Sequence, residues 1–154
     1  MSYRKIYTID QEELKTIRKQ EYTEIIPAEL CKKFNDFVSA QYPWVPVTAY
    51  RIDWEKLLSY KRFQWDDASN EEIAKFLNTT CLSMFKEVCM VYSYREPGIL
   101  VAFEFARNNL WSLTSNGWGT RFMVGVKRNS YGVAELVEDC FVEIDCADWL
   151  TAPY

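Results

Sequence analysis

The first half of the chain carries apolar residues at helical spacing. In the segment PAELCKKFNDFVSAQ they follow an i, i+4, i+7, i+8 pattern, which places them on one face of a helix: Leu30, Phe34, Phe37 and Val38. Pro27 precedes them and suits the first turn of a helix. The prolines of QYPWVPV end this helix, because a proline disfavours helical conformation in the residue before it.

A second helix is indicated in SNEEIAKFLNTTCLSMFKEV, where Ser69 and Glu72 have the spacing of a capping box. Its apolar positions share one face and predict a helix as far as about residue 88: Ile73, Phe76, Leu77, Met84, Phe85 and Val88. Two shorter helices are expected. One starts at Asp10 and runs to about residue 20, and the other covers residues 53–60.

After residue 88 the pattern changes to that of strands. VCMVYSYR and ILVAFEFAR are β-branched and aromatic runs joined by the turn sequence Glu-Pro-Gly, and NSYG is a second turn between RFMVGVKR and DCFVEIDC. Helices followed by an antiparallel meander predict an α+β fold, with N-terminal helices packed on one face of a C-terminal sheet. We expect one domain over residues 1–154, with a helical part at about 10–87 and a β part at about 88–146.

The composition is that of a folded globular protein, with 49% apolar and 26% charged residues. Aromatic residues reach 16%, which favours a binding surface, because such side chains anchor interfaces. The first residues, MSYRKIYTIDQEE, contain no apolar run, and no uncharged stretch is long enough to span a bilayer. These observations predict a cytoplasmic protein with no membrane partner.

Two residue types limit the chemistry. The five cysteines are odd in number and have no CxxC spacing, so we expect buried reduced thiols rather than a disulfide framework or a zinc site. The chain has no histidine, which excludes Ser-His-Asp and Cys-His catalysis and zinc ligation by imidazole. Acid–base chemistry would need a shifted carboxylate, Lys, Tyr or Cys. The sequence therefore predicts a protein that is not an enzyme and uses no cofactor.

Charge is distributed unevenly along the chain. Residues 1–128 hold 18 Lys and Arg against 16 Asp and Glu, a net charge of +2, whereas the acidic end (residues 129–154) holds six acids and no base. In a strand over DCFVEIDC, alternate side chains would point to opposite faces. One face carries Cys140, Val142, Ile144 and Cys146, and the other carries Asp139, Phe141, Glu143 and Asp145.

The acidic end has three interpretations. Its carboxylates could form a solvated face neutralised by Arg121, Lys127 and Arg128, or a divalent-metal site of a hydrolase, or a docking surface for a cationic protein. We favour the docking surface, because the acidic end itself contains no Lys or Arg to stabilise a phosphate and the chain has no phosphate-binding glycine loop. Its predicted contact residues are Glu138, Asp139, Phe141, Glu143, Asp145, Asp148 and Trp149, together with Trp118, which glycines flank on both sides.

The segments VEDCFVEIDCADW and NGWGTRF, in a small acidic chain rich in aromatics, resemble bacterial immunity proteins of toxin–immunity pairs of the contact-dependent growth inhibition type. The resemblance implies a cytoplasmic inhibitor of a cognate toxin, often a basic nuclease. Nucleic acid is not expected as a partner, because phosphates would be repelled by a chain with pI near 5.0. A regulatory adaptor of phage or host origin is the alternative without catalysis.

Overall fold

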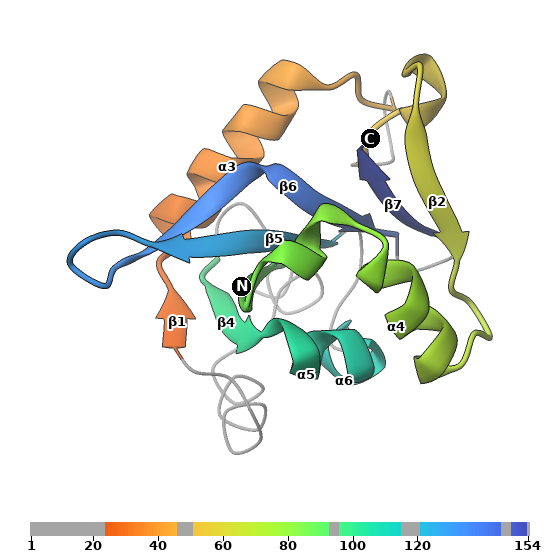
Figure 1. Ribbon diagram of the computed structural model, residues 1–154. Helices are drawn as coiled ribbons and strands as arrows, with labels where there is room; N and C mark the ends of the chain where they lie inside the picture. Colours follow the sequence, from red (N-terminus) through yellow and green to blue (C-terminus); the bar gives the residue numbers. More distant parts are fainter. Residues whose placement is uncertain (1–23, 46–50, 93–95, 115–120, 146–148, 154) are drawn as a thin grey trace, which may run out of the picture.

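A seven-stranded antiparallel sheet forms the centre of the computed structural model, which describes residues 24–45, 51–92, 96–114, 121–145 and 149–153 (Figure 1). The strand order is β1-β4-β3-β5-β6-β7-β2. The strands are β1 (Glu24–Ile26), β2 (Tyr60–Gln64), β3 (Glu87–Val91), β4 (Gly98–Ala102), β5 (Arg121–Arg128), β6 (Ala134–Ile144) and β7 (Trp149–Pro153). With the helices described below, this sheet confirms the predicted α+β fold.

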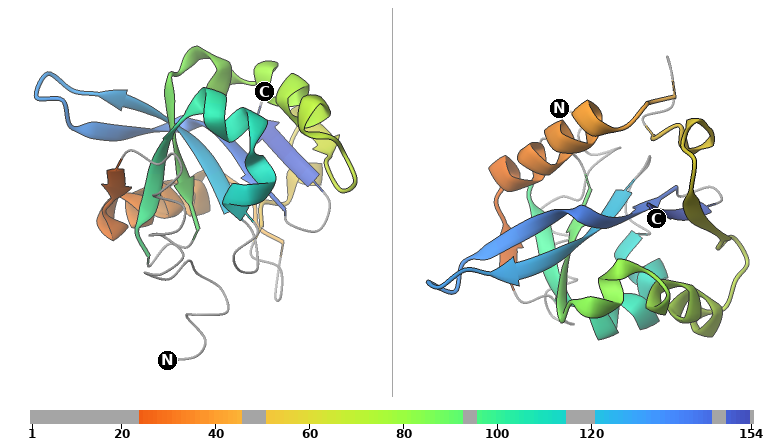
Figure 2. Two further views of the ribbon diagram at one scale, coloured as in Figure 1. Left: turned by 90° about the horizontal axis from the view of Figure 1, so that it is seen from below. Right: turned by 45° about the horizontal axis from the view of Figure 1, so that its top comes forward.

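Helices cover both faces of the sheet (Figure 2). One face is covered by α3 (Ala28–Gln41), and the other by α4 (Asn70–Asn78), η2 (Cys81–Met84), α5 (Phe103–Asn108) and α6 (Leu110–Thr114). Successive residues of β3 accordingly enter different cores: Val88 packs with α4–α6, and Cys89 packs with α3. The sequence predicted helices on one face only, but the sheet is a middle layer whose central strands are apolar on both sides.

Element boundaries follow local signals where these are strong. Ser69 and Glu72 form the predicted capping box, with hydrogen bonds of 3.0 and 3.1 Å between each side chain and the other residue's backbone N–H. The helix α4 ends at Asn78 rather than near residue 88, because the hydroxyls of Thr79 and Thr80 bond to the last carbonyls and the chain continues as η2 and β3.

Other predicted elements are shorter than expected. The helix expected at 53–60 is a single turn, η1 (Trp54–Lys56), after which β2 starts. The predicted strand ILVAFEFAR divides into β4 and α5 at residue 103. The helix expected at 10–20 lies outside the described residues, and among the helices that the structure does describe, none is long and apolar enough to cross a membrane.

The cysteines differ from the expectation of reduced thiols. Cys81 of η2 and Cys140 of β6 form a disulfide, although 59 positions separate them in sequence. Cys31 and Cys89 are free and buried, as predicted, and Cys146 is not among the described residues. The prediction was wrong for the first pair because a disulfide depends on distance in the fold, here a Cα–Cα separation of 5.8 Å, and not on sequence spacing.

Candidate functional site

The predicted acidic strand is β6, and both of its faces are buried over its second half. Cys140, Val142 and Ile144 point into the core under α4–α6, as predicted. On the opposite face Phe141 is 0% exposed and packs edge-on against Phe34 of α3, with ring centroids 5.5 Å apart. The predicted contact of Phe141 with a partner is therefore wrong, because α3 covers that face of the strand.

Glu143 is the second correction, since its predicted docking role needs an exposed side chain and only 2% of the residue is exposed. Its two carboxylate oxygens accept hydrogen bonds of 2.8 Å from the backbone N–H of Ile52 and the indole N–H of Trp54. Burial raises the pKa of Glu143 to about 7, although both hydrogen bonds favour the charged form. The carboxylate fastens the segment 51–55 to the sheet.

Asp145 is neutralised within the chain. Its carboxylate lies 2.8 Å from Nη1 of Arg51, in an ion pair in which Arg51 is the more exposed partner. Of the bases proposed from sequence, Lys127 faces Glu135 of the acidic end in the strand register, whereas Arg128 contacts Glu24 and Glu87 at 3.1 Å, outside that end. The side chain of Arg121 is not among the described residues.

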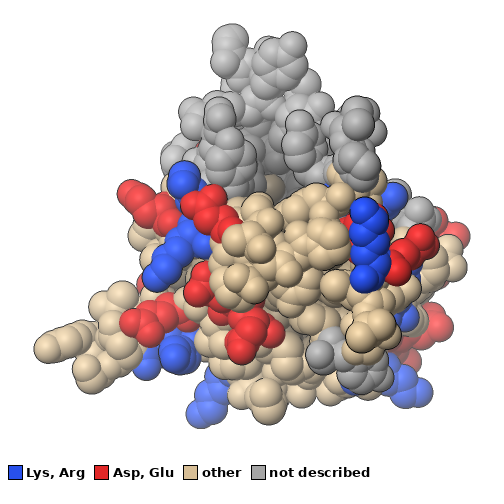
Figure 3. Space-filling view, turned by 90° about the horizontal axis from the view of Figure 1, so that it is seen from above, with Lys and Arg blue, Asp and Glu red and all other residues tan. Residues whose placement is uncertain are grey.

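Glu138 and Asp139 remain at the surface. The register between β5 and β6 shifts where Val124 faces Phe141 and the next residue of β5 faces Val137, so residues 138–140 form a bulge. Burial, and secondarily the charge of Asp139, raises the pKa of Tyr42. On the face seen in Figure 3, Asp and Glu side chains are interspersed with Lys and Arg rather than gathered in one patch. Asp148 and Trp118 lie outside the described residues.

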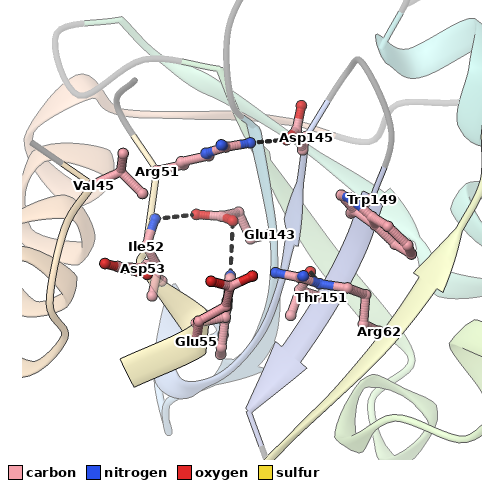
Figure 4. Close-up of a pocket in the computed structure, with 11 residues that line it drawn as sticks. Val45, Arg51, Ile52, Asp53, Glu55, Arg62, Glu143, Asp145, Trp149 and Thr151 are labelled. Atoms are coloured by element: carbon pink, nitrogen blue, oxygen red, sulfur yellow. Dashed lines mark hydrogen bonds and ion pairs between the residues drawn. The ribbon is translucent and has the colours of Figure 1, made fainter. Parts of the chain in front are cut away.

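Three of the predicted residues meet at a cavity of about 340 Å³, which we call the Glu143 pocket. It is lined by the segment 51–55, by Glu143 of β6 and Asp145 just after it, by Trp149 and Thr151 of β7, and by Arg62 of β2 (Figure 4). The pocket combines polar groups of both charges with a buried carboxylate of shifted pKa, and a shifted carboxylate in a cleft marks a candidate ligand site.

Arg62 is held by aromatic contacts. Its guanidinium carbon lies 5.2 Å from the ring centroid of Tyr60 and 5.0 Å from that of Trp149, and its Nε donates a hydrogen bond of 3.3 Å to Oγ1 of Thr151. Trp149, predicted as an anchor for a partner, thus orients an arginine of the pocket. Sequence reasoning missed Arg51 and Arg62 because both lie more than 80 residues from the strands they contact.

Within the described ranges, no three Asp, Glu, His or Cys side chains are grouped so that they could hold a metal ion. Three of the pocket's four acids instead contact basic or N–H groups: Asp53, Glu143 and Asp145.

A different feature is exposed at the other end of β6. The hairpin between β5 and β6 projects from the body of the protein (Figure 1, Figure 2), and at its tip (residues 129–133) Tyr131 is 90% and Val133 is 54% exposed. Asn129 orders this tip, because its Oδ1 accepts the N–H groups of Tyr131 at 2.8 Å and Val133 at 3.1 Å. Gly132 supplies the positive φ of 79° that the turn requires. The sequence predicted this turn but not its exposed aromatic residue as a site.

Comparison with known proteins places the chain in no group: no family model, no curated protein and no solved structure matches it.

Proposed function

We propose that this protein is an inhibitor that binds a cognate toxin, and that the hairpin tip, rather than the acidic strand, anchors the complex. The observation that supports this most directly is the exposure of Tyr131, 90%, at the end of an ordered projecting hairpin. Tyr131 and Val133 lie together at this tip, and aromatic side chains are favoured as anchors of protein interfaces.

The tip has the properties of an interface anchor. Tyrosine is enriched among the residues whose truncation weakens protein complexes most. The hydrogen bonds from Asn129 and the contact of Arg128 Nη1 with the carbonyl of Gly132, at 2.9 Å, fix the turn before a partner arrives. Because an ordered loop loses little conformational entropy on binding, it can enter a concave site of a partner at low cost.

The charge of the chain still favours a cationic partner, which includes a basic nuclease toxin. The net charge of −4 attracts such a protein over distances up to about a Debye length, although Glu143 and Asp145 are occupied by contacts within the chain. We leave the cytoplasmic location out of the proposal, because the Cys81–Cys140 disulfide is of a kind that persists in oxidising compartments.

The test compares two variants that each remove an exposed apolar side chain. Wild type, Tyr131→Ala and Leu58→Ala are used to co-purify proteins from the native source, and each captured protein is then assayed for toxicity with and without the wild-type chain. Leu58 is a matched control, because its side chain is fully exposed, 106%, and lies in a different part of the chain.

The proposal expects one partner that wild type and Leu58→Ala retain and Tyr131→Ala loses, and whose toxic activity the wild-type chain suppresses at equimolar ratio. Retention of the same partner by Tyr131→Ala would overturn the role of the tip. Capture of a partner whose activity is unaffected would favour a regulatory adaptor instead.

A further inference from the structure

The Glu143 pocket contains a cationic group that the fold orients but does not neutralise. Arg62 uses Nε for Thr151 and its planar face for Tyr60 and Trp149, and it makes no ion pair with any carboxylate among the described residues. Its two terminal amino groups remain available, and their spacing matches the two oxygens of a carboxylate. In Figure 4 the guanidinium extends from β2 over Thr151 toward the centre of the group.

The side of the pocket formed by the segment 51–55 and β6 is acidic. Glu55 lines it together with Glu143, whereas Asp145 is paired with Arg51 and Asp53 with Lys56, the latter at 3.7 Å. Each oxygen of Glu143 accepts one hydrogen bond from the chain, and a carboxylate oxygen can accept a second. Acceptor capacity for a donor cation is therefore present opposite the free amino groups of Arg62.

A ligand of this pocket has to be compatible with both the positive charge of Arg62 and the negative charges opposite it. A simple anion bound to Arg62 would be repelled by Glu55 and Glu143, and a simple cation would be repelled by Arg62. A molecule that carries one group of each sign satisfies both sides without adding net charge. The volume of about 340 Å³ is at the small end of the range for ligand pockets, so the molecule is small.

We infer that the Glu143 pocket binds a small zwitterion of the amino-acid type, with its carboxylate on Arg62 and its ammonium group facing Glu143 and Glu55. This site requires no protein partner, so it goes beyond the proposed inhibitor function and stands or falls separately from it. Thr151 and Trp149 act here as positioning residues, because they fix the guanidinium rather than touch the ligand's charges.

The experiment is a titration of the ¹⁵N-labelled full chain followed by NMR. The probes are glycine, β-alanine and 4-aminobutyrate, which differ in the distance between their charges, with acetate and ethylammonium as single-charge controls at equal ionic strength. The indole N–H of Trp54 is the reporter, because it donates to Glu143 inside the pocket. We expect at least one amino acid to shift this signal saturably, with an affinity about tenfold or more above that of either single ion.

Two variants and one control locate the binding. Arg62→Gln removes the anion contact and should weaken the amino-acid probe about tenfold or more, whereas Arg107→Gln removes an arginine that lies over Phe103, outside the residues that line the pocket, and should change the affinity less than about twofold. Glu55→Gln, on an exposed side chain, should weaken the amino acid but not acetate. Thermal unfolding checks that each variant is folded. If Arg62→Gln does not fold, the affinities measured with Glu55→Gln decide whether the ligand binds in this pocket.

Absence of a saturable shift with all three amino acids would overturn the assignment. The assignment would also fail if acetate bound as tightly as the best amino acid, because the acidic side of the pocket would then contribute nothing to the affinity. An equal loss of affinity in Arg62→Gln and Arg107→Gln would place the binding elsewhere. None of these results depends on a partner, so the inhibitor proposal is tested separately.

Discussion

The two ends of β6 reverse the usual arrangement of polar and apolar groups. At the hairpin tip that leads into the strand, Tyr131 and Val133 are exposed, whereas near the strand's far end the carboxylate of Glu143 is buried. The difference arises from the rest of the chain, because the segment 51–55 covers the far end and nothing that the structure describes covers the tip. The charge of a segment therefore does not tell which of its groups faces solvent.

The two regions should also differ in what a substitution changes. At the far end, side chains contact the core, so their loss should lower the free energy of unfolding. At the tip they contact only solvent and the turn itself, so their loss should change binding and leave the free energy of unfolding nearly unchanged. The following predictions test this contrast.

The largest expected effect is that of Phe141→Ala. Phe141 is fully buried between α3 and β5 and contacts the rings of Phe34 and Phe122, so its truncation should lower the free energy of unfolding by about 3–5 kcal/mol. Tyr131→Ala is the comparison and should change it by less than about 0.5 kcal/mol. Urea unfolding measures both. A loss below about 1 kcal/mol for Phe141→Ala would mean that the side chain is exposed after all.

The next effect is a dependence on pH. The pKa of Glu143 is raised from 4.5 to about 7 in the folded state, so the protonated form is favoured by folding. Its contribution to stability is complete below pH 4.5 and is lost as the pH rises through 7, a decrease of about 3 kcal/mol. The difference in unfolding free energy between wild type and Glu143→Gln should therefore shrink by this amount between pH 4.5 and 8. A difference that stays constant with pH would contradict the shifted pKa.

A smaller effect is expected at the tip from Asn129→Ala. This substitution removes the acceptor of two backbone N–H groups, those of Tyr131 and Val133, and should lower the free energy of unfolding by about 1 kcal/mol. Hydrogen exchange of these two amides should accelerate, while that of Ile52 near Glu143 should not. Unchanged exchange at the tip would show that Asn129 does not order it.

The smallest effect is expected from Arg51→Gln. The Arg51–Asp145 ion pair is partly exposed, with 44% of the arginine side chain accessible, so screening by water limits its value to less than about 1 kcal/mol. The loss should diminish further in high salt. Urea unfolding at low and high salt measures it, and a loss that salt does not change would indicate that the pair is shielded from solvent.

The parts of the fold that could be predicted from sequence are those set by neighbouring residues. The capping box of Ser69 and Glu72, the one-sided helix α3 and the turn at residues 129–132 each depend on contacts within a few positions. The inward face of β6, with Cys140, Val142 and Ile144, followed from alternation alone. All of these were predicted correctly.

The candidate site could not be predicted in the same way, because its contacts join distant segments. Glu143 is buried by Ile52 and Trp54, about 90 positions earlier, and Arg62 is placed by Trp149 and Thr151 of a strand that the sequence did not predict. Alternation showed that Glu143 and Phe141 share a face, but not that α3 and the segment 51–55 cover it. The pattern of residues within one strand does not show whether distant segments of the chain pack over that face.

Carboxylate footprinting tests the central claim most directly. Carbodiimide coupling of glycine ethyl ester to the folded protein, followed by peptide mass spectrometry, reports which carboxylates of one strand reach solvent. We predict that Glu135 and Asp139 of β6 react readily and that Glu143 reacts only after unfolding. Modification of Glu143 in the folded protein at the rate of Asp139 would contradict the inward placement of this acid and restore the strand as an exposed surface.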